Sequence, residues 1–267
     1  MTRVIVHPGF HKTGTSSLQT FMAKNADVLA PFVTFYGKAA FLQAGSAARI
    51  YGQKPYPWRL RAFRVALDRF LVSIPDDPVI VLSRETFSGA MPGHRRLFGR
   101  LVKDYERAAV PLGHQIVAAL RQRFGADVQI EFFYTLRERE DWISSVYGHL
   151  LRSIHLAEDF EAFRNRFPNL RDPAEESATI AARLGIDIVH FARLEDVGQH
   201  REGPASALLD LLDIPDDVRA DLPAARRANV GQSADLKEEF LAMNRAGQDK
   251  IALKREKDRM LRKAKDG

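Results

Sequence analysis

Short apolar runs alternate along the chain with longer segments whose apolar residues recur at helical spacing. Continuous runs predict buried strands at residues 3–8, 78–82 and 128–135, and weaker ones predict strands at 33–36 and 187–191. Helical periodicity predicts helices over 16–28, 57–74, 110–124, 140–152, 158–167, 173–184 and 204–212, and a long polar helix from 234 onwards. Strands that alternate with helices are typical of βαβ units. The sequence therefore predicts an α/β fold, a three-layer sandwich with a central, mostly parallel sheet flanked by helices.

The pattern contains no internal repeat, low-complexity tract or obvious interdomain linker. A length of 267 residues allows one large α/β domain or two small ones. We therefore expect a single domain over residues 1–233, followed by a polar, basic helical tail over 234–267.

The charge of the chain is concentrated in this tail. The formal net charge is +6 and the pI is near 9.6, values that favour a nucleic-acid partner. Residues 250–265, however, hold 8 basic and 2 acidic side chains, which leaves 32 of each sign in the rest of the chain. We therefore expect no nucleic-acid partner. The tail is interpreted as a solvated, frayed helix, with contact to an anionic partner or membrane surface as the alternative.

Composition excludes several classes of site. The chain has no cysteine, so it has no disulfide, thiolate metal site or cysteine nucleophile. No cluster of residues has metal-ligand spacing, so no metal is expected. The N-terminus lacks the apolar region of a signal peptide, and no apolar run reaches the roughly 18 residues of a membrane span. We expect a cytoplasmic protein without stable membrane insertion; its oligomeric state stays open.

The turn after the first predicted strand is the most informative stretch. Residues 7–17, HPGFHKTGTSS, follow a buried strand and open a helix. Gly9 and Gly14 allow close backbone approach, and the first N–H groups of a helix bind oxyanions. Lys12 adds a charge, and the neighbouring hydroxyls add donors. An ordinary turn whose serines cap the helix is the alternative.

The same turn departs from the loop of nucleotide kinases. That loop reads G-x-x-x-x-G-K-[ST], with lysine directly after the last glycine. Here the two glycines have the right spacing, but Thr15 follows Gly14 and Lys12 precedes it. No strand ends in an obvious magnesium-binding aspartate, since the second strong strand runs into Ser83-Arg84-Glu85.

The five residues from Lys12 to Ser16, KTGTS, resemble the 5′-phosphosulfate loop of sulfotransferases that use 3′-phosphoadenosine 5′-phosphosulfate (PAPS). In that family a strand runs into a Lys-[ST]-Gly-Thr-[ST] loop. The resemblance implies a P-loop-like fold, PAPS as sulfuryl donor and adenosine 3′,5′-bisphosphate as product. It also implies that the donor's 5′-phosphate is held by the loop, that is by Lys12, Thr13, Gly14, Thr15, Ser16 and Ser17.

A second segment matches the same family. Its members place an arginine after a strand and a serine eight residues later, usually followed by x-Tyr. Here Arg137 follows the third strong strand, and Ser145-Val146-Tyr147 comes eight residues on. Both would contact the 3′-phosphate, with Ser144 as an alternative to Ser145, because the family's proline after the arginine is absent.

Two looser matches extend the resemblance to about residues 4–231. Residues 190–215 resemble the family's late strand, acidic turn and helix. Arg226-Arg227-Ala228-Asn229 resembles the basic loop that closes over the nucleotide, so Arg227 and Asn229 are further candidates for donor binding.

The residues suggest roles in sulfuryl transfer, which needs charge stabilisation, in-line positioning and a base. Lys12 is the candidate for the bridging and leaving oxygens. Glu85 is the candidate base, because it follows a strand at the sheet edge where ligands bind, and a structural ion pair or cap is its alternative role. His7 and His11 flank the loop as alternative bases. Arg84 is a candidate for binding the sulfuryl group or an acidic acceptor.

The sequence thus favours a sulfotransferase acting on a hydroxyl or amino group of a carbohydrate or small molecule. Two other classes stay open. One is a P-loop kinase-like phosphotransferase, and the other is a non-enzymatic module that binds a nucleotide or anion through the same loop.

Overall fold

The computed structural model describes residues 1–225, 233–247 and 249–266 of the chain. It consists of two compact units, Met1–Glu138 with Arg171–Asn229 and Arg139–Leu170 with Val230–Gly267. The expected domain boundary at residue 233 stays a prediction.

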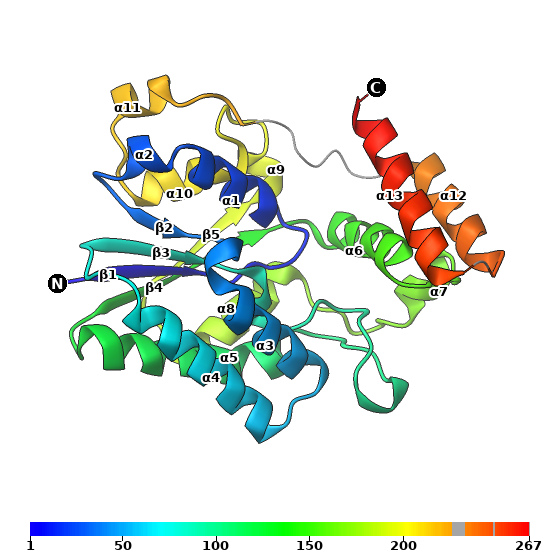
Figure 1. Ribbon diagram of the computed structural model, residues 1–267, viewed down its shortest axis with the longest axis horizontal. Coiled ribbons are helices and arrows are strands. Elements are labelled where there is room, and N and C mark those ends of the chain that lie inside the picture. Colours follow the sequence, from blue (N-terminus) through cyan, green and yellow to red (C-terminus); the bar gives the residue numbers. More distant parts are fainter. Residues whose placement is uncertain (226–232, 248, 267) are drawn as a thin grey trace. The chain divides into compact units, whose positions relative to one another are not determined.

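The first unit is built on a five-stranded parallel sheet (Figure 1). Its strands are β1 (Arg3–His7), β2 (Thr34–Tyr36), β3 (Val79–Ser83), β4 (Gln129–Leu136) and β5 (Val189–Arg193). They lie in the order β2-β3-β1-β4-β5, and all four neighbouring pairs are parallel. The predicted α/β fold with a central parallel sheet is confirmed.

Helices cover both faces of this sheet (Figure 1). One face carries α1 (Thr15–Lys24), α2 (Ala26–Leu29) and α10 (Ser206–Leu211). The other carries α4 (Pro57–Val72), α5 (Glu106–Phe124) and α8 (Pro173–Leu184). The remaining elements of this unit are α3 (Leu42–Gln53), α9 (Leu194–Val197), α11 (Asp216–Asp221) and the 3₁₀ turns η1 (Lys38–Phe41), η2 (Glu85–Ser88), η3 (Leu97–Gly99) and η4 (Gly203–Ala205).

Alternating strand residues supply the two halves of the core. The face toward α1 and α10 buries Ile5, Val81 and Phe133. The neighbouring residues of β1 and β3, Val4 and Ile80, are also fully buried, which places them on the face toward α4 and α5. Because both faces are covered, the strands read as continuous apolar runs in the sequence.

The expected helix over 16–28 is broken into α1 and α2 at Asn25. This residue is 3% exposed. Its backbone N–H and its side-chain amide both donate to the carbonyl of Phe21, at 3.1 and 2.8 Å. An asparagine that satisfies a terminal carbonyl in this way ends a helix.

The second unit contains α6 (Arg139–Ser153), α7 (Phe160–Asn165), α12 (Ala234–Arg245) and α13 (Lys250–Asp266). The tail is helical, as expected, but α13 is not a solvated helix throughout. Leu253 and Lys257 are 3% and 1% exposed. The Lys257 ammonium donates to the Leu151 carbonyl at 2.7 Å and to the side chain of Asn244. One face of the basic tail therefore packs inside this unit.

Within the part of the chain that the structure describes, no helix combines the length and apolarity that a bilayer crossing requires.

Candidate functional site at the carboxyl edge of the sheet

The loop between β1 and α1 contains three residues with positive φ angles. These are Gly9 at 107°, Lys12 at 69° and Gly14 at 91°. Gly14 is the N-cap of α1, and glycine has no side chain with which to cap the helix. The first turn of α1 holds no acidic residue. The positive end of the helix dipole thus has no carboxylate in its own first turn, and helix N-termini of this kind can bind anions.

Two buried threonines fix the shape of this loop. The Thr13 and Thr15 hydroxyls donate to the Phe10 carbonyl at 2.7 and 3.0 Å. The loop is also bonded to the end of β4, where the Thr135 N–H donates to the Gly9 carbonyl at 3.2 Å. These hydroxyls therefore organise the loop. Ser16 is exposed and Ser17 is half-buried, so their side chains lie nearer the surface.

His7 joins three strands beneath the loop. It is fully buried, with Nδ1 2.8 Å from Ser83 Oγ and Nε2 3.1 Å from Thr135 Oγ1. The Thr13 hydroxyl already donates its hydrogen to the Phe10 carbonyl, so in its contact with Thr135 it must accept. The Thr135 hydroxyl therefore donates to Thr13 at 2.9 Å and accepts a hydrogen bond from His7 Nε2–H. Ser83 in turn donates to Nδ1. Both ring nitrogens are hydrogen-bonded within the fold, which makes His7 a weaker candidate base than Glu85 and favours a positioning role.

The tautomer assigned to His7 agrees with its ionisation. Burial lowers the pKa of His7 to about 4, although the charge of Glu85 acts in the opposite direction. The ring is therefore neutral at pH 7. A neutral imidazole with one donor and one acceptor fits the hydroxyls on either side of it.

His11 and Phe10 face Tyr105, which precedes α5. The rings of Phe10 and Tyr105 stack with centroids 4.2 Å apart, and Tyr105 Oη lies 3.1 Å from His11 Nδ1. Burial lowers the pKa of His11 to about 3, and the charges of His94, Arg84, Lys12 and Arg49 lower it further. A base this weak is poorly matched to proton abstraction near pH 7. His11 is therefore a weaker candidate than Glu85.

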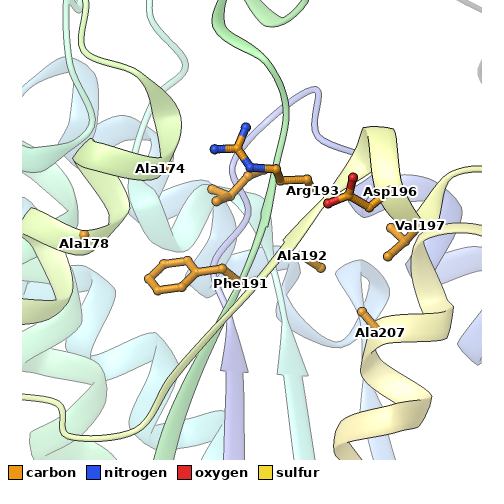
Figure 2. A pocket seen from close by; sticks show the side chains of 9 residues that line it. Ala174, Ala178, Phe191, Ala192, Arg193, Asp196, Val197 and Ala207 are labelled. Carbon is orange, nitrogen blue, oxygen red and sulfur yellow. The ribbon is translucent and has the colours of Figure 1, made fainter.

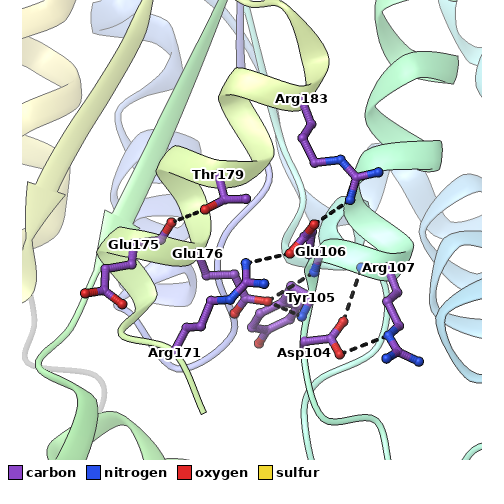
Figure 3. A network of polar contacts seen from close by, with 9 residues as sticks. All are labelled: Asp104, Tyr105, Glu106, Arg107, Arg171, Glu175, Glu176, Thr179 and Arg183. Atoms are coloured by element: carbon purple, nitrogen blue, oxygen red, sulfur yellow. Dashed lines mark hydrogen bonds and ion pairs between the residues drawn. The ribbon is translucent and has the colours of Figure 1, made fainter. Parts of the chain in front are cut away.

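The carboxylate of Glu176, on α8, accepts hydrogen bonds from the backbone at Tyr105 (Figure 3). Its Oε1 accepts the backbone N–H groups of Tyr105 and Glu106 at 2.6 and 3.1 Å, at the start of α5. Glu106 itself pairs with Arg171 and Arg183. Burial raises the pKa of Glu176 to about 7, against the two backbone hydrogen bonds that lower it.

We expect Glu176→Gln to change how stability depends on pH. Because the folded pKa of about 7 exceeds the ordinary 4.5, the contribution of this group is complete below pH 4.5 and is lost as pH rises through 7. The unfolding free energy of wild type minus that of the variant should therefore fall by roughly 3 kcal/mol between pH 4.5 and pH 7. Urea denaturation from pH 4 to 8.5 measures it.

The neighbouring Glu175 is exposed and serves as the matched control. The pH-dependent change in stability should be larger for Glu176→Gln than for Glu175→Gln, because the change expected at Glu176 comes from its burial. A flat difference for Glu176→Gln would show that Glu176 does not titrate in this range.

Glu85 and Arg84 lie beside the loop at the end of β3. A Cβ atom on Gly9 would lie 3.2 Å from the Glu85 Cα atom, so the two backbones are in contact. The Arg84 N–H donates to the His7 carbonyl at 2.9 Å, and Arg84 Nη1 lies 3.7 Å from Glu85 Oε1. The side chain of Glu85 is one-fifth exposed. The fold therefore brings Glu85 to the edge that also holds the loop of Lys12.

The second set of candidate residues is divided between the two units. Arg137 follows β4 in the first unit, whereas Ser144 and Ser145 lie on α6 in the second. The Ser144 hydroxyl accepts from Lys237 Nζ of α12 at 2.8 Å. Arg227 and Asn229 lie outside the described residues.

A pocket of about 460 Å³ lies along the edge strand β5. Its lining is mostly small and apolar, with the half-exposed ring of Phe191 projecting toward α8 and Val197 on the other side of the strand (Figure 2). The polar groups of the lining are Arg193 and Asp196. The pocket adjoins the loop, because α9 begins at Leu194, whose side chain would lie 3.0 Å from a Cβ atom on Gly14. Its volume suits a small organic ligand.

Among the described residues, no three His, Asp or Glu side chains gather in a way that would hold a metal ion.

Comparison with known proteins does not assign the chain to a family. No protein-family model matches it, and no curated protein matches its sequence. What is established is the α/β fold with its parallel five-stranded sheet.

Several residues of this edge are not evident from motif matching. Ser83 and Thr135 hold His7, Gln19 donates to the Ser83 carbonyl at 3.0 Å, and Tyr105 packs on the loop. One signal in the sequence marks two of them: Ser83 and Thr135 are polar residues at or near the ends of continuous apolar strands. Tyr105 and Glu176 carry no such signal, because their roles depend on contacts between distant segments.

Proposed function

We propose that this chain is a sulfotransferase that moves a sulfuryl group from PAPS to a hydroxyl or amino group of a carbohydrate or small molecule. One observation carries the proposal. Lys12 has a left-handed backbone conformation two residues before the N-cap of α1, in a loop at the carboxyl end of the central strand whose Gly9 lies against the backbone of Glu85. The KTGTS motif, which resembles the 5′-phosphosulfate loop, is the sequence of this turn.

In the proposed reaction, the N–H groups from Thr13 to Ser17 hold the 5′-phosphate of the donor. Glu85 accepts the proton of the acceptor hydroxyl or amine as that oxygen or nitrogen forms its bond to sulfur. The bond between sulfur and the 5′-phosphate oxygen breaks at the same time. Lys12 stabilises the negative charge on the leaving oxygen. The products are the sulfated acceptor, adenosine 3′,5′-bisphosphate and the proton held by Glu85.

The rest of the donor is assigned to neighbouring features. We place the adenine in the pocket along β5, because it is apolar, adjoins the loop at Leu194 and offers the ring of Phe191 for stacking. Arg137 and Ser145 are proposed for the 3′-phosphate, and Arg227 and Asn229 for closure over the nucleotide. A cytoplasmic location is part of the same proposal.

A phosphotransferase is the rival enzyme. It requires a lysine after Gly14, where this chain has Thr15, and a magnesium-binding aspartate at the end of a strand, where β3 runs into Ser83-Arg84-Glu85. The other rival is a module that binds nucleotides or anions without catalysis.

Thermal unfolding with added ligands tests the proposal. Adenosine 3′,5′-bisphosphate should raise the Tm, by an amount that grows with concentration because the ligand binds the folded state only. ATP with magnesium should not raise it. The reverse result would favour the phosphotransferase, and no shift with either ligand would favour a module of another kind.

Turnover separates an enzyme from a nucleotide-binding module. Incubation with sulfur-labelled PAPS and a panel of saccharides, phenols and amines should yield a labelled acceptor. Stabilisation by the nucleotide without transfer to any of these classes would support the module.

A further inference from the structure

Arg84 is a buried cation at the edge of the sheet, and its environment is built closely around it. The residue is 7% exposed. Its Nε donates to Thr86 Oγ1 at 3.1 Å. On the other side lies Gly45 of α3, where a Cβ atom would come within 2.3 Å of Nε. The guanidinium is therefore held between η2 and a helix position that has no side chain.

Two buried polar atoms in this region have no hydrogen-bond partner among the described residues. They are Nη1 of Arg84 and Nδ1 of His94. Arg84 Nη1 forms an ion pair with Glu85 Oε1, but the distance of 3.7 Å between the two atoms is too long for a hydrogen bond. Buried donors of charged groups are rarely left in this state, because the loss of hydration is not offset. A ligand that accepts hydrogen bonds would satisfy them.

The surroundings are also positively charged. Burial and the nearby charges of Arg84 and Arg49 lower the pKa of His11, and burial together with the charge of Arg49 lowers the pKa of His94. The two arginines therefore supply the charge, and His94 adds a buried hydrogen-bonding nitrogen. Arg49 is exposed and lies on α3 four residues after Gly45, on the same side of the helix. Arg49 thus lies at the exposed rim of this site, and Arg84 lies at its buried end.

We propose that Arg84, His94 and Arg49 form a subsite for an anionic group of the acceptor, a carboxylate or a sulfate, beside Glu85. The inference rests on the proposed function for the identity of the acceptor. The order of the strands supports this assignment. Arg84 follows β3, on one side of β1, whereas the pocket assigned to adenine follows β5, on the other side. The acceptor class that follows is an acidic saccharide or an acidic small molecule.

Binding of inorganic sulfate tests the subsite directly. It is measured by calorimetry at constant ionic strength in the presence of saturating adenosine 3′,5′-bisphosphate, which fills the proposed donor site. Arg84→Gln should weaken this binding by about 10- to 100-fold, since a charged hydrogen-bonding group is lost. Arg49→Ala should weaken it less, because its side chain is exposed. Arg59→Ala removes an equally exposed arginine from α4 and should bind sulfate as wild type does.

Gly45→Ala tests the geometry without removing a charge. The added methyl group must displace the Arg84 guanidinium, so sulfate binding should weaken although every cation is retained. Circular dichroism shows whether Arg84→Gln folds. If it does not, Gly45→Ala and Arg49→Ala still test the proposal. Equal sulfate binding in wild type, Gly45→Ala and Arg49→Ala would overturn the proposal.

A matched pair of sugars tests the acceptor assignment. Methyl glucuronide carries a carboxylate where methyl glucoside has a hydroxymethyl group. The glucuronide should bind more tightly to wild type, and this preference should disappear in Arg84→Gln and Gly45→Ala. No preference in wild type would overturn the assignment to an acidic acceptor.

The donor is the other source of an anion at this place. Its sulfuryl group is present in PAPS and absent from adenosine 3′,5′-bisphosphate. Sulfate binding that persists with PAPS supports an acceptor subsite, whereas displacement by PAPS would assign Arg84 to the donor and overturn it. Arg84-dependent sulfate binding without any nucleotide binding would leave the subsite standing and refute the proposed function instead.

Discussion

Lys12→Ala should lower the rate of sulfuryl transfer by at least about 10²–10³-fold, the effect of removing a group that stabilises charge in the transition state. The loss should appear in kcat, because the charge on the leaving oxygen develops as the bond to sulfur breaks. The fold should be retained. Lys12 already has a φ of 69°, and alanine meets the same steric cost in that conformation as lysine does.

Steady-state kinetics with labelled PAPS measures this effect, and unfolding in urea checks the stability of the variant. Lys24→Ala is the control, since it removes an exposed lysine from the other end of α1. It should turn over at the wild-type rate. If Lys12→Ala turned over at the wild-type rate, Lys12 would have no role in the mechanism. The resemblance of the loop to a 5′-phosphosulfate loop would then no longer support the proposed function.

Glu85→Gln should lower kcat by about 10²–10⁴-fold, the range for a general base. Gln retains the size of the side chain and its contact with Arg84, but it cannot accept the proton from the acceptor. The Tm shift produced by adenosine 3′,5′-bisphosphate should stay as in wild type, because this residue faces the acceptor in the proposed reaction.

Two further variants make this result specific. Glu239→Gln neutralises an exposed glutamate of α12 and should leave kcat unchanged. His11→Asn removes the alternative base that also borders the loop. If His11→Asn abolished transfer and Glu85→Gln did not, the base would be His11, in spite of the low basicity that burial gives it.

The strands could be predicted from the sequence, whereas one packed helix could not. The three strong strands were placed to within a residue or two, because both faces of the sheet are covered and each strand is a continuous apolar run. Helix α3 was not predicted. Its packing positions are small, such as Gly45 against Arg84 and Gly52 against the backbone of Ala90, so it lacks an apolar stripe.

The C-terminal tail is a second case in which the sequence pattern did not predict the packing. Its composition indicates a solvated helix, and charged side chains are almost never fully buried without partners. Lys257 is buried nonetheless, because the Leu151 carbonyl and Asn244 accept from its ammonium and the ring of Phe240 lies 5.7 Å from it. Those partners come from other segments of the second unit, which no pattern within the tail could identify.

The sequence by itself determined the alternation of strands and helices, the place of the glycine-bearing loop and the chemical character of Lys12 and Glu85. These properties are local, since they depend on side-chain type and on spacing along the chain. The tertiary structure decided which groups meet. It buried His7 between Ser83 and Thr135 and bound the Thr13 hydroxyl to the loop. It also left Arg84 Nη1 buried without a hydrogen-bond partner among the described residues. Burial and hydrogen bonding are set by neighbours far apart in the chain, so they follow only from the packed fold.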